Sequence, residues 1–265
     1  MNLDLSIDLN ADVGEGMADA HLLPFLTSAN VACGLHAGDP DSMDETVSLA
    51  ITHGVAIGAH PGYADRENFG RVFVEMPAGE VERLVLYQIG ALDAFVRARG
   101  AVLTHVKPHG ALYHAGIEYP DVARAIAEAV RRYRSTLILV GKSGSMLTGA
   151  GRDSGLTVAD EAFADRRYQA DGSLVPRSRS GAVLTDPEEA AAQAVSIARD
   201  GVAVAEDGSR VAMRADTICV HGDTAGAPAI ARLIRERLRQ ESITVAPLRV
   251  PRKGGPAPAR VEGHA

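Results

Sequence analysis

Acidic, amide, imidazole and lysine side chains recur in this sequence at the ends of short apolar runs. Enzymes use these residue types to activate water and to stabilise developing charge. Burying one unpaired charge costs several kcal/mol, so a folded chain tolerates many of them only where they pair with one another, a ligand or a metal ion. The set consists of Asp8, Asn10, Asp12, Glu15, Asn30, Cys33, His36, Asp39, His60, His105, Lys107, His109, Glu161, Asp165, Arg166, His221 and Asp223. The pattern predicts a hydrolytic site assembled from several strand ends.

Four of these histidines stand beside or close to glycine or proline. The segments are HAGDP (36–40), HPG (60–62), PHG (108–110) and HGD (221–223). Glycine permits tight turns and close approach of the backbone to another group. For any single residue a loop or surface position explains the pattern equally well, but its recurrence favours one shared site.

Two kinds of hydrolytic chemistry fit these residues. In the first, imidazole and carboxylate ligands hold a divalent metal ion that lowers the pKa of a bound water. Asp12, His60 and His105 are the candidate ligands, and the absence of an HExxH motif means that they must come from separate strands. In the second, histidine and carboxylate groups act as general acid and base while Lys107 stabilises negative charge. Cys33 is equally well interpreted as a nucleophile or as a small buried residue.

Strands and helices alternate along the chain. Short apolar runs at 5–9, 28–33, 55–59, 102–106, 136–140, 156–159 and 217–220 predict strands, and helical spacing predicts helices at 41–53, 77–99, 120–134 and 229–239. Asp186 followed by Pro187 marks a further helix start, because aspartate caps and proline fits the first turn. The pair Asp171-Gly172 predicts a hairpin turn outside the main sheet.

Alternating strands and helices imply a mostly parallel sheet, either an open doubly wound sheet or a closed barrel. A barrel gathers all its strand ends in one mouth, whereas an open sheet binds ligands mainly at its switch point. Because polar clusters follow most of the seven predicted strands, we expect an α/β fold with a seven-stranded parallel β/α barrel. One barrel domain is predicted over residues 1–250, followed by a disordered tail at 251–265 that is rich in Pro, Gly and Ala.

Composition narrows the functional classes. The formal net charge of -7 over 265 residues argues against nucleic-acid binding, which needs a surplus of basic residues. The first sixteen residues, MNLDLSIDLNADVGEG, lack the basic and apolar regions of a signal peptide, and no run approaches a membrane span. With two cysteines and no disulfide framework, we expect a cytoplasmic protein that binds neither nucleic acid nor membrane.

Six segments of the chain resemble the signature segments of one protein family, the LamB/YcsF family. They are DLNADVGEG (8–16), TSANVACGLHAGDP (27–40), GVAIGAHPGYAD (54–65), HVKPHGALY (105–113), EAFADRRY (161–168) and TICVHGD (217–223), and they occur in order over residues 5–245. The resemblance implies a barrel related to the glycoside hydrolases and polysaccharide deacetylases. It also implies one component of an ATP-dependent 5-oxoprolinase, which opens 5-oxo-L-proline (pyroglutamate) to L-glutamate together with partner subunits B and C.

The resemblance also suggests roles for the site residues. A five-membered lactam resists water, so phosphorylation of its carbonyl oxygen would explain the use of ATP, and we expect the partner subunits to handle much of that step. Asp8, Asp12 or His60 would then activate water, while Lys107 and His109 stabilise the oxyanion. The expected substrate-binding residues are Asn10, Glu15, Asn30, His36, His105, Glu161, Arg166, His221 and Asp223. Two alternatives stay open, namely a metal-dependent deacetylase or amidohydrolase that needs no ATP, and a non-catalytic subunit that binds the lactam.

Overall fold

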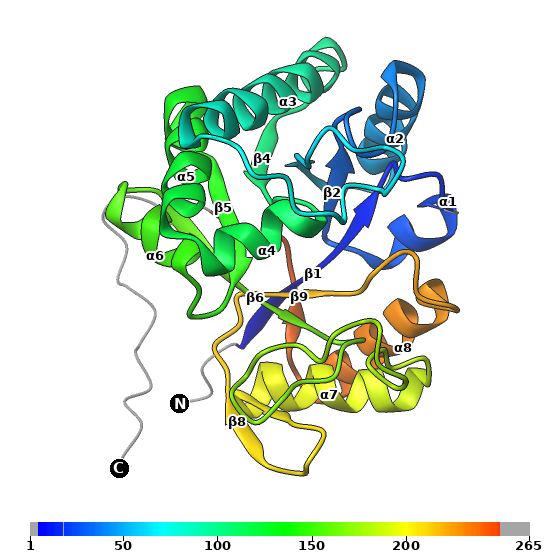
Figure 1. Cartoon of the computed structure of the whole chain (residues 1–265). Helices are drawn as coiled ribbons and strands as arrows, with labels where there is room; N and C mark the ends of the chain where they lie inside the picture. Colours follow the sequence, from blue (N-terminus) through cyan, green and yellow to red (C-terminus); the bar gives the residue numbers. More distant parts are fainter. Residues whose placement is uncertain (1–4, 18, 250–265) are drawn as a thin grey trace.

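Seven parallel strands close into a barrel in the computed structural model, which describes residues 5–17 and 19–249 (Figure 1). In order around the barrel they are β1 (Ser6–Val13), β2 (Ser28–Ala32), β3 (Ala56–His60), β4 (Leu103–Val106), β5 (Ile138–Lys142), β6 (Thr157–Phe163) and β9 (Thr217–Cys219). Strand β9 pairs with both β6 and β1 and so closes the sheet. The predicted seven-stranded β/α barrel is therefore confirmed, and the open sheet is excluded. The tail predicted at 251–265 lies outside the described residues.

Helices cover the outside of the barrel. The long ones are α2 (Pro40–Thr52), α3 (Ala78–Ala98), α5 (Pro120–Arg134), α7 (Pro187–Asp200) and α8 (Ala227–Gln240). Figure 1 shows the α3–α5 pair and the α7–α8 pair on opposite sides of the strands. Helices α2, α3, α5 and α8 lie within about two residues of their predicted bounds, and α7 begins at its predicted start. Apolar stripes and terminal signals agree in these segments. No helix in the described part of the chain is long and apolar enough to cross a membrane.

Aspartate side chains cap two of the long helices, and the cap at Asp186 was predicted from the sequence. The Asp39 side chain accepts a hydrogen bond from the Ser42 amide at the start of α2, and the Ser42 hydroxyl accepts one from the Asp39 amide in return. The Asp186 side chain accepts from the Glu188 amide at the start of α7. These bonds satisfy amide groups that have no partner within the helix.

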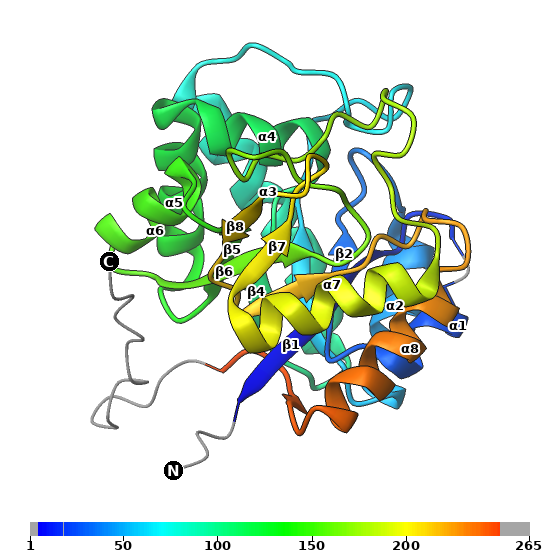
Figure 2. The same ribbon diagram turned by 90° about the horizontal axis from the view of Figure 1, so that it is seen from below.

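The short elements were harder to predict from the sequence. The helices α1 (Asp19–Leu22), α4 (Gly110–Glu118) and α6 (Met146–Asp153), the 3-10 turn η1 (Leu23–Phe25) and β10 (Thr244–Val245), which pairs with β1, complete the barrel. The predicted turn at Asp171-Gly172 is confirmed, since Tyr168 pairs antiparallel with Leu174. A second hairpin, β7 (Val202–Val204) with β8 (Arg210–Ala212), was not predicted and packs beside α7 (Figure 2).

Strand β1 positions much of the site by alternation. Leu9, Ala11 and Val13 are fully buried in the apolar core, and the polar residues between them occupy the opposite face of the strand. Asn10 and Asp12, expected after the strand, lie within it, and β6 likewise extends through Glu161. Because interior-facing and exterior-facing residues alternate along a barrel strand, polar residues that face the interior continue the strand.

Candidate active site

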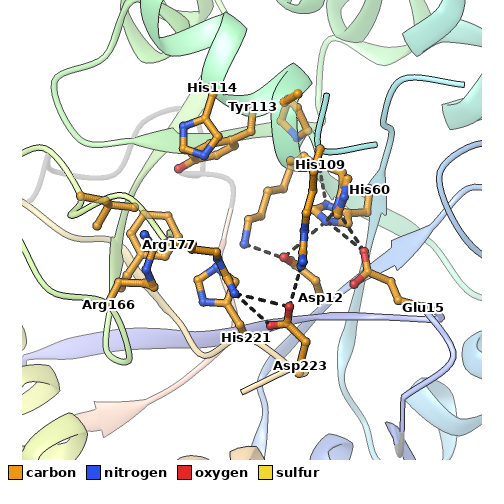
Figure 3. A pocket seen from close by; sticks show the side chains of 18 of the residues that line it. Asp12, Glu15, His60, His109, Tyr113, His114, Arg166, Arg177, His221 and Asp223 are labelled. Atoms are coloured by element: carbon orange, nitrogen blue, oxygen red, sulfur yellow. Dashed lines mark hydrogen bonds and ion pairs between the residues drawn. The ribbon is translucent and has the colours of Figure 1, made fainter. Parts of the chain in front are cut away.

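A cavity of about 470 Å³ opens at the carboxyl ends of the barrel strands (Figure 3). The predicted site residues that line it are Asp12, Glu15, His60, Lys107, His109, Arg166, His221 and Asp223. It is also lined by Arg71, Tyr113, His114, Phe163 and Arg177, none of which the sequence singled out. The ends of β1, β3, β4, β6 and β9 thus contribute to one site, as expected for a barrel mouth.

A buried ammonium group lies at the floor of this cavity. Lys107 Nζ is 3.0 Å from Asp12 Oδ1 and 2.9 Å from Glu161 Oε1, and its side chain is 3% exposed. The other oxygen of Glu161, Oε2, accepts a hydrogen bond of 2.7 Å from the Tyr113 hydroxyl. Two carboxylates therefore surround the Lys107 ammonium group. Their negative charges offset the cost of burying this cation.

The charges of this group reinforce one another. Burial opposes the ammonium form, but Asp12 and then Glu161 outweigh it and hold the pKa of Lys107 well above its usual range. Burial likewise opposes ionisation of Asp12, yet His60 and Lys107 hold the pKa of that carboxyl well below its usual range. At neutral pH Lys107 is an ammonium ion and Asp12 a carboxylate, so Lys107 can stabilise negative charge but cannot act as a base.

His60 lies at the end of β3 with both ring nitrogens engaged. Nδ1 is 2.7 Å from the carbonyl oxygen of Lys107, to which it donates a hydrogen bond, and Nε2 is 3.4 Å from Asp12 Oδ2. Burial opposes the charged imidazolium, but Asp12 and Glu15 raise the pKa of His60 above its usual value. His60 therefore connects the Lys107 group with the next cluster of residues.

That next cluster consists of Glu15, His36, His60 and His109. Glu15 Oε1 is 2.9 Å from His36 Nε2, 3.1 Å from His109 Nδ1 and 3.7 Å from His60 Nε2. Burial opposes ionisation of Glu15, but its close contacts with His109 and His36 lower its pKa to about 2. Burial lowers the pKa of His36 to about 4, so this imidazole is neutral at neutral pH. These four side chains and the set Asp12, Cys219 and His221 are the groups of possible metal ligands among the described residues.

Several predicted site residues lie below the cavity floor. The Asp8 carboxylate accepts hydrogen bonds from the Thr27, Ser28 and Thr217 hydroxyls, and burial raises its pKa. Neither Asp8 nor any of its three partners lines the cavity. We therefore remove Asp8 from the candidate bases.

His105, Asn10 and Asn30 also belong to this lower layer. His105 Nε2 is 2.9 Å from Asn30 Oδ1, and its Nδ1 is 2.7 Å from the Thr104 hydroxyl. Burial lowers the pKa of His105 to about 3. Both nitrogens are engaged and His105 is in neither group of possible metal ligands, so the set Asp12, His60 and His105 is not brought together. Asn10 and Asn30 support the cavity floor from beneath, since Asn30 Nδ2 donates to Asp12 Oδ1 at 2.9 Å.

Cationic side chains line the opposite wall of the cavity. Arg166 is 4% exposed, its Nη2 donates to the Val175 carbonyl, and its Nε has no hydrogen-bond partner. No described carboxylate lies within ion-pair distance of Arg166. Burial and the neighbouring Arg177 lower the pKa of Arg166 to about 10, so its charge persists without an anion. A buried guanidinium in this state favours an anionic ligand.

Asp223 and His221 were both expected to bind substrate, and both line the cavity, but protein groups engage them to different extents. Asp223 is held by Arg71 Nη2 at 2.5 Å and by Arg177 at 3.4 Å. His221 Nδ1 contacts Asp165 Oδ1 at 2.9 Å, which leaves the other ring nitrogen of His221 free of protein contacts among those described. Arg71 and Arg177 come from loops without a recognisable motif, and only the barrel brings them to Asp223.

The cysteines have no nucleophilic character. Burial raises the pKa of Cys33 to about 12, and its Sγ faces the Val31 carbonyl. Burial also holds the pKa of Cys219 well above its usual range, although Lys107 Nζ lies 3.2 Å from its sulfur. Of the two interpretations of Cys33, the small buried residue is the one that the structure supports.

Comparisons with known proteins agree with the fold and with the sequence motifs. The model of the LamB/YcsF family matches residues 7–253. The A subunit of 5-oxoprolinase from Methylococcus capsulatus is 51% identical over 92% of this chain and 96% of its own length, and that from Brevibacillus brevis is 49% identical over 91% and 97%.

Two solved structures extend the comparison. A lactam utilization protein from Thermus thermophilus superposes with a TM-score of 0.87 at 46% identity, covering 92% of this chain and all of the other. The catalytic domain of a peptidoglycan N-acetylglucosamine deacetylase from Eubacterium rectale superposes with a TM-score of 0.52 at 11% identity, covering 99% and 96%. The second likeness concerns the barrel fold alone.

Proposed function

This chain belongs to the LamB/YcsF family, and we propose that it is the A subunit of an ATP-dependent 5-oxoprolinase. The enzyme would open 5-oxo-L-proline to L-glutamate and convert ATP to ADP and phosphate, with two further subunits, B and C. The proposal is supported by two relatives of about half identity that carry the name of the 5-oxoprolinase A subunit, and by a similar solved structure named for lactam utilization. A cytoplasmic location stays a prediction.

The observation that carries the proposal is the contrast between the two walls of the cavity. One wall presents the ionised Asp12 beside Lys107, and the other presents the buried Arg166 without a carboxylate partner. A lactam that bears a carboxylate needs both walls. The cationic wall would bind its carboxylate, and the wall with Asp12 and Lys107 would contact the reacting amide. We assign Arg166 to the substrate carboxylate, because a guanidinium can bind a carboxylate through two parallel hydrogen bonds.

Asp12 is the best placed base. Its side chain is 12% exposed, compared with 7% for Glu15 and 3% for Lys107, so it is the most accessible of these groups to a water in the cavity. Asp12 would take a proton as water adds to the lactam carbonyl carbon. The ring C–N bond would then break, and the nitrogen would receive that proton as it becomes the amine of glutamate. Lys107 would hold Asp12 in place and stabilise the negative charge on oxygen.

The lowered pKa of Asp12 favours an ATP-dependent reaction. A carboxylate whose pKa lies well below its usual range is a weak base, and an unactivated amide would need a stronger one. Phosphorylation of the carbonyl oxygen makes the carbon electrophilic enough for a weak base. Breaking the ring C–N bond of the phosphorylated lactam would leave an acyl phosphate, and a second water would then release phosphate and glutamate. We therefore assign the ATP step largely to the partner subunits and the water step to this chain. The same reasoning weighs against a deacetylase or amidohydrolase that works without ATP.

The test is a coupled assay of ADP and glutamate release from 5-oxo-L-proline. We expect glutamate only when this chain, its partner subunits and ATP are all present, and we expect Lys107→Ala and His60→Ala to abolish it. Circular dichroism of each variant would check that it folds. Arg167→Gln, which alters a surface residue paired with Glu189, serves as the control and should retain turnover.

Three outcomes would contradict the proposal. Glutamate release without ATP would identify an amidohydrolase. Normal turnover in both folded variants would indicate a subunit that binds the lactam or braces its partners without performing the chemistry. No turnover by the complete wild-type assembly with ATP would remove 5-oxoproline as the substrate.

A further inference from the structure

We propose that Glu15, His36, His60 and His109 bind a divalent transition-metal ion at the edge of the cavity. The four side chains follow four consecutive barrel strands, β1 to β4, and converge on one point (Figure 3 labels three of them). Their ligand atoms all lie within 4.8 Å of one another. The site shares only His60 with the predicted ligands Asp12, His60 and His105, and metal binding there can be measured without the lactam reaction proposed above.

The hydrogen bonds of two histidines determine which ring nitrogens carry lone pairs. His60 Nδ1 faces the Lys107 carbonyl at 2.7 Å and His109 Nε2 faces the Phe69 carbonyl at 2.8 Å. A carbonyl oxygen only accepts, so both of these nitrogens carry hydrogen. In the neutral rings, His60 Nε2 and His109 Nδ1 therefore point lone pairs at each other across 3.0 Å. A positive charge between them, either a proton on His60 or a metal ion, removes this repulsion. Backbone carbonyls that orient the outer ring nitrogens are typical of metal-binding histidines.

The distances fit a metal ion better than a shared proton. A proton bridges only two atoms, whereas here a carboxylate oxygen also lies 3.1 Å from His109 Nδ1 and 2.9 Å from His36 Nε2. A tetrahedral ion with bonds of ~2.0–2.1 Å places its ligands about 3.3 Å apart. The short contacts among the four ligand atoms, 2.9 to 3.7 Å, bracket that separation. No described group holds the other ring nitrogen of His36, Nδ1, so its Nε2 can present a lone pair to the ion.

The donor set selects the kind of ion. Three imidazoles and one carboxylate suit Zn²⁺ and similar transition-metal ions, whereas Mg²⁺ and Ca²⁺ prefer oxygen ligands. The other possible group, Asp12 with Cys219 and His221, is unsuited because the Lys107 ammonium contacts both Asp12 and Cys219. A cation already occupies that position. Glu15, His60 and His109 line the cavity, so an ion bound by them borders the space where substrate binds.

Two glycines make room for this arrangement. The His36 and His109 rings stack in parallel with centroids 3.8 Å apart. A Cβ atom added at Gly62 would lie 2.7 Å from His36 Nδ1, and one added at Gly70 would lie 2.8 Å from His36 Cβ. Gly62 has an ordinary backbone conformation, so Gly62→Ala displaces His36 without removing any ligand side chain.

The test is a titration of the metal-free, full-length chain with Zn²⁺ and Mg²⁺ by calorimetry, together with elemental analysis. We expect one Zn²⁺ per chain and Mg²⁺ binding that is at least about 100-fold weaker. Co²⁺ should give the intense visible absorption of a four-coordinate site, a readout that needs no variant. His36→Gln and His109→Gln should each raise the Zn²⁺ Kd by about 100-fold or more, and Gly62→Ala by about 10-fold.

His114→Gln is the matched control, because His114 also lines the cavity but lies outside the cluster, and it should keep the Zn²⁺ Kd within about threefold. The proposal is overturned if the folded wild-type chain binds neither Zn²⁺ nor Co²⁺, or if both ligand variants bind Zn²⁺ as tightly as the wild type. Mg²⁺ binding of equal strength would also overturn it. None of these measurements uses ATP, lactam or partner subunits, so their failure would leave the proposed function untouched.

Discussion

The barrel interior holds two layers of polar residues that look alike in the sequence and differ in the structure. In the lower layer, Asp8 accepts hydrogen bonds from three hydroxyls, and His105 is held by Asn30 and Thr104. In the upper layer, Asp12, Lys107 and Glu15 face a cavity. Asp8 and Asp12 belong to the same strand and the same face, so depth along the barrel separates a structural carboxylate from a functional one.

The same contrast holds for the histidines. Both ring nitrogens of His105 are satisfied by protein groups, whereas His60 and His109 direct one nitrogen each toward the other and toward Glu15. A layer whose polar groups are all satisfied from within specifies the packing of the barrel. A layer whose nitrogen and oxygen atoms border the cavity can bind a substrate or a metal ion.

The largest predicted difference is in turnover, when the same substitution of aspartate by asparagine is made in the upper and in the lower layer. Asp12→Asn should lower turnover by the reconstituted enzyme about 1,000-fold, because it removes the base. Asp8→Asn makes the same chemical change four residues earlier and should keep turnover within about threefold. The glutamate assay measures both, and circular dichroism checks the fold. Equal losses in two folded variants would show that depth does not separate the roles.

A second prediction concerns the cationic wall of the upper layer. Arg166→Gln should raise the KM for 5-oxo-L-proline about 10- to 100-fold with a smaller change in kcat, because it removes a charged contact to a non-reacting group. The neighbouring Arg167→Gln alters an ion pair with Glu189 and a hydrogen bond to the Gly181 carbonyl, both outside the cavity, and should leave KM unchanged. Steady-state kinetics distinguish the two, and an unaltered KM in Arg166→Gln would remove Arg166 from the substrate site.

A third prediction addresses the stability of the lower layer. Asp8→Ala should lower the free energy of unfolding by about 1–3 kcal/mol, because three buried hydroxyls lose their acceptor. Thr217→Val removes one of these bonds and the bond that Asn10 Nδ2 donates to the Thr217 hydroxyl, and it should cost about 1–2 kcal/mol. Denaturant unfolding of both single variants and the double variant measures the coupling. Strictly additive losses would mean that the two side chains do not act as one network.

The smallest predicted effect is a pH dependence caused by His105. Burial lowers the pKa of His105 to about 3, whereas in the unfolded chain it is near its usual value of 6.5. The unfolded chain therefore binds the extra proton as pH falls below 6.5, and stability is lost in that range. His105→Gln should reduce the loss between pH 7 and pH 5 by about 1–2 kcal/mol. Urea unfolding at both values tests this, with the exposed His53→Gln as control, and the same loss in variant and wild type would refute it.

Much of the fold could be predicted because its signals are local. Each long helix has an apolar stripe and a cap or proline at its start, as Asp39 and Asp186 illustrate. Helix α4 was missed because the segment that contains Gly110 resembles a loop, and only its packing against α5 and α6 makes it helical. The β7–β8 hairpin was missed because its strands have three residues each, too few for a periodic signal.

The site was predicted as a set of residue types but not as a set of contacts. Tyr113 donates a hydrogen bond to Glu161. Its place in the motif HVKPHGALY was the one feature of the sequence that could have marked it as a site residue. Arg71 and Arg177 gave no signal, since isolated arginines in loops are common on surfaces. Asp8 and His105 were included because alternation identifies the face of a strand and carries no information about depth.

The sequence by itself determined the alternation that turns Asp8, Asn10 and Asp12 to one face, the starts of the long helices and the family motifs. Those properties depend on neighbours within one element. The tertiary structure alone decided that Lys107 meets Asp12, 95 residues away, and that Asn10 meets Glu161, 151 residues away. Such contacts depend on the closure of the barrel by β9 and on the height of each residue within the barrel. The spacing of polar and apolar residues within one strand or helix predicts neither of these.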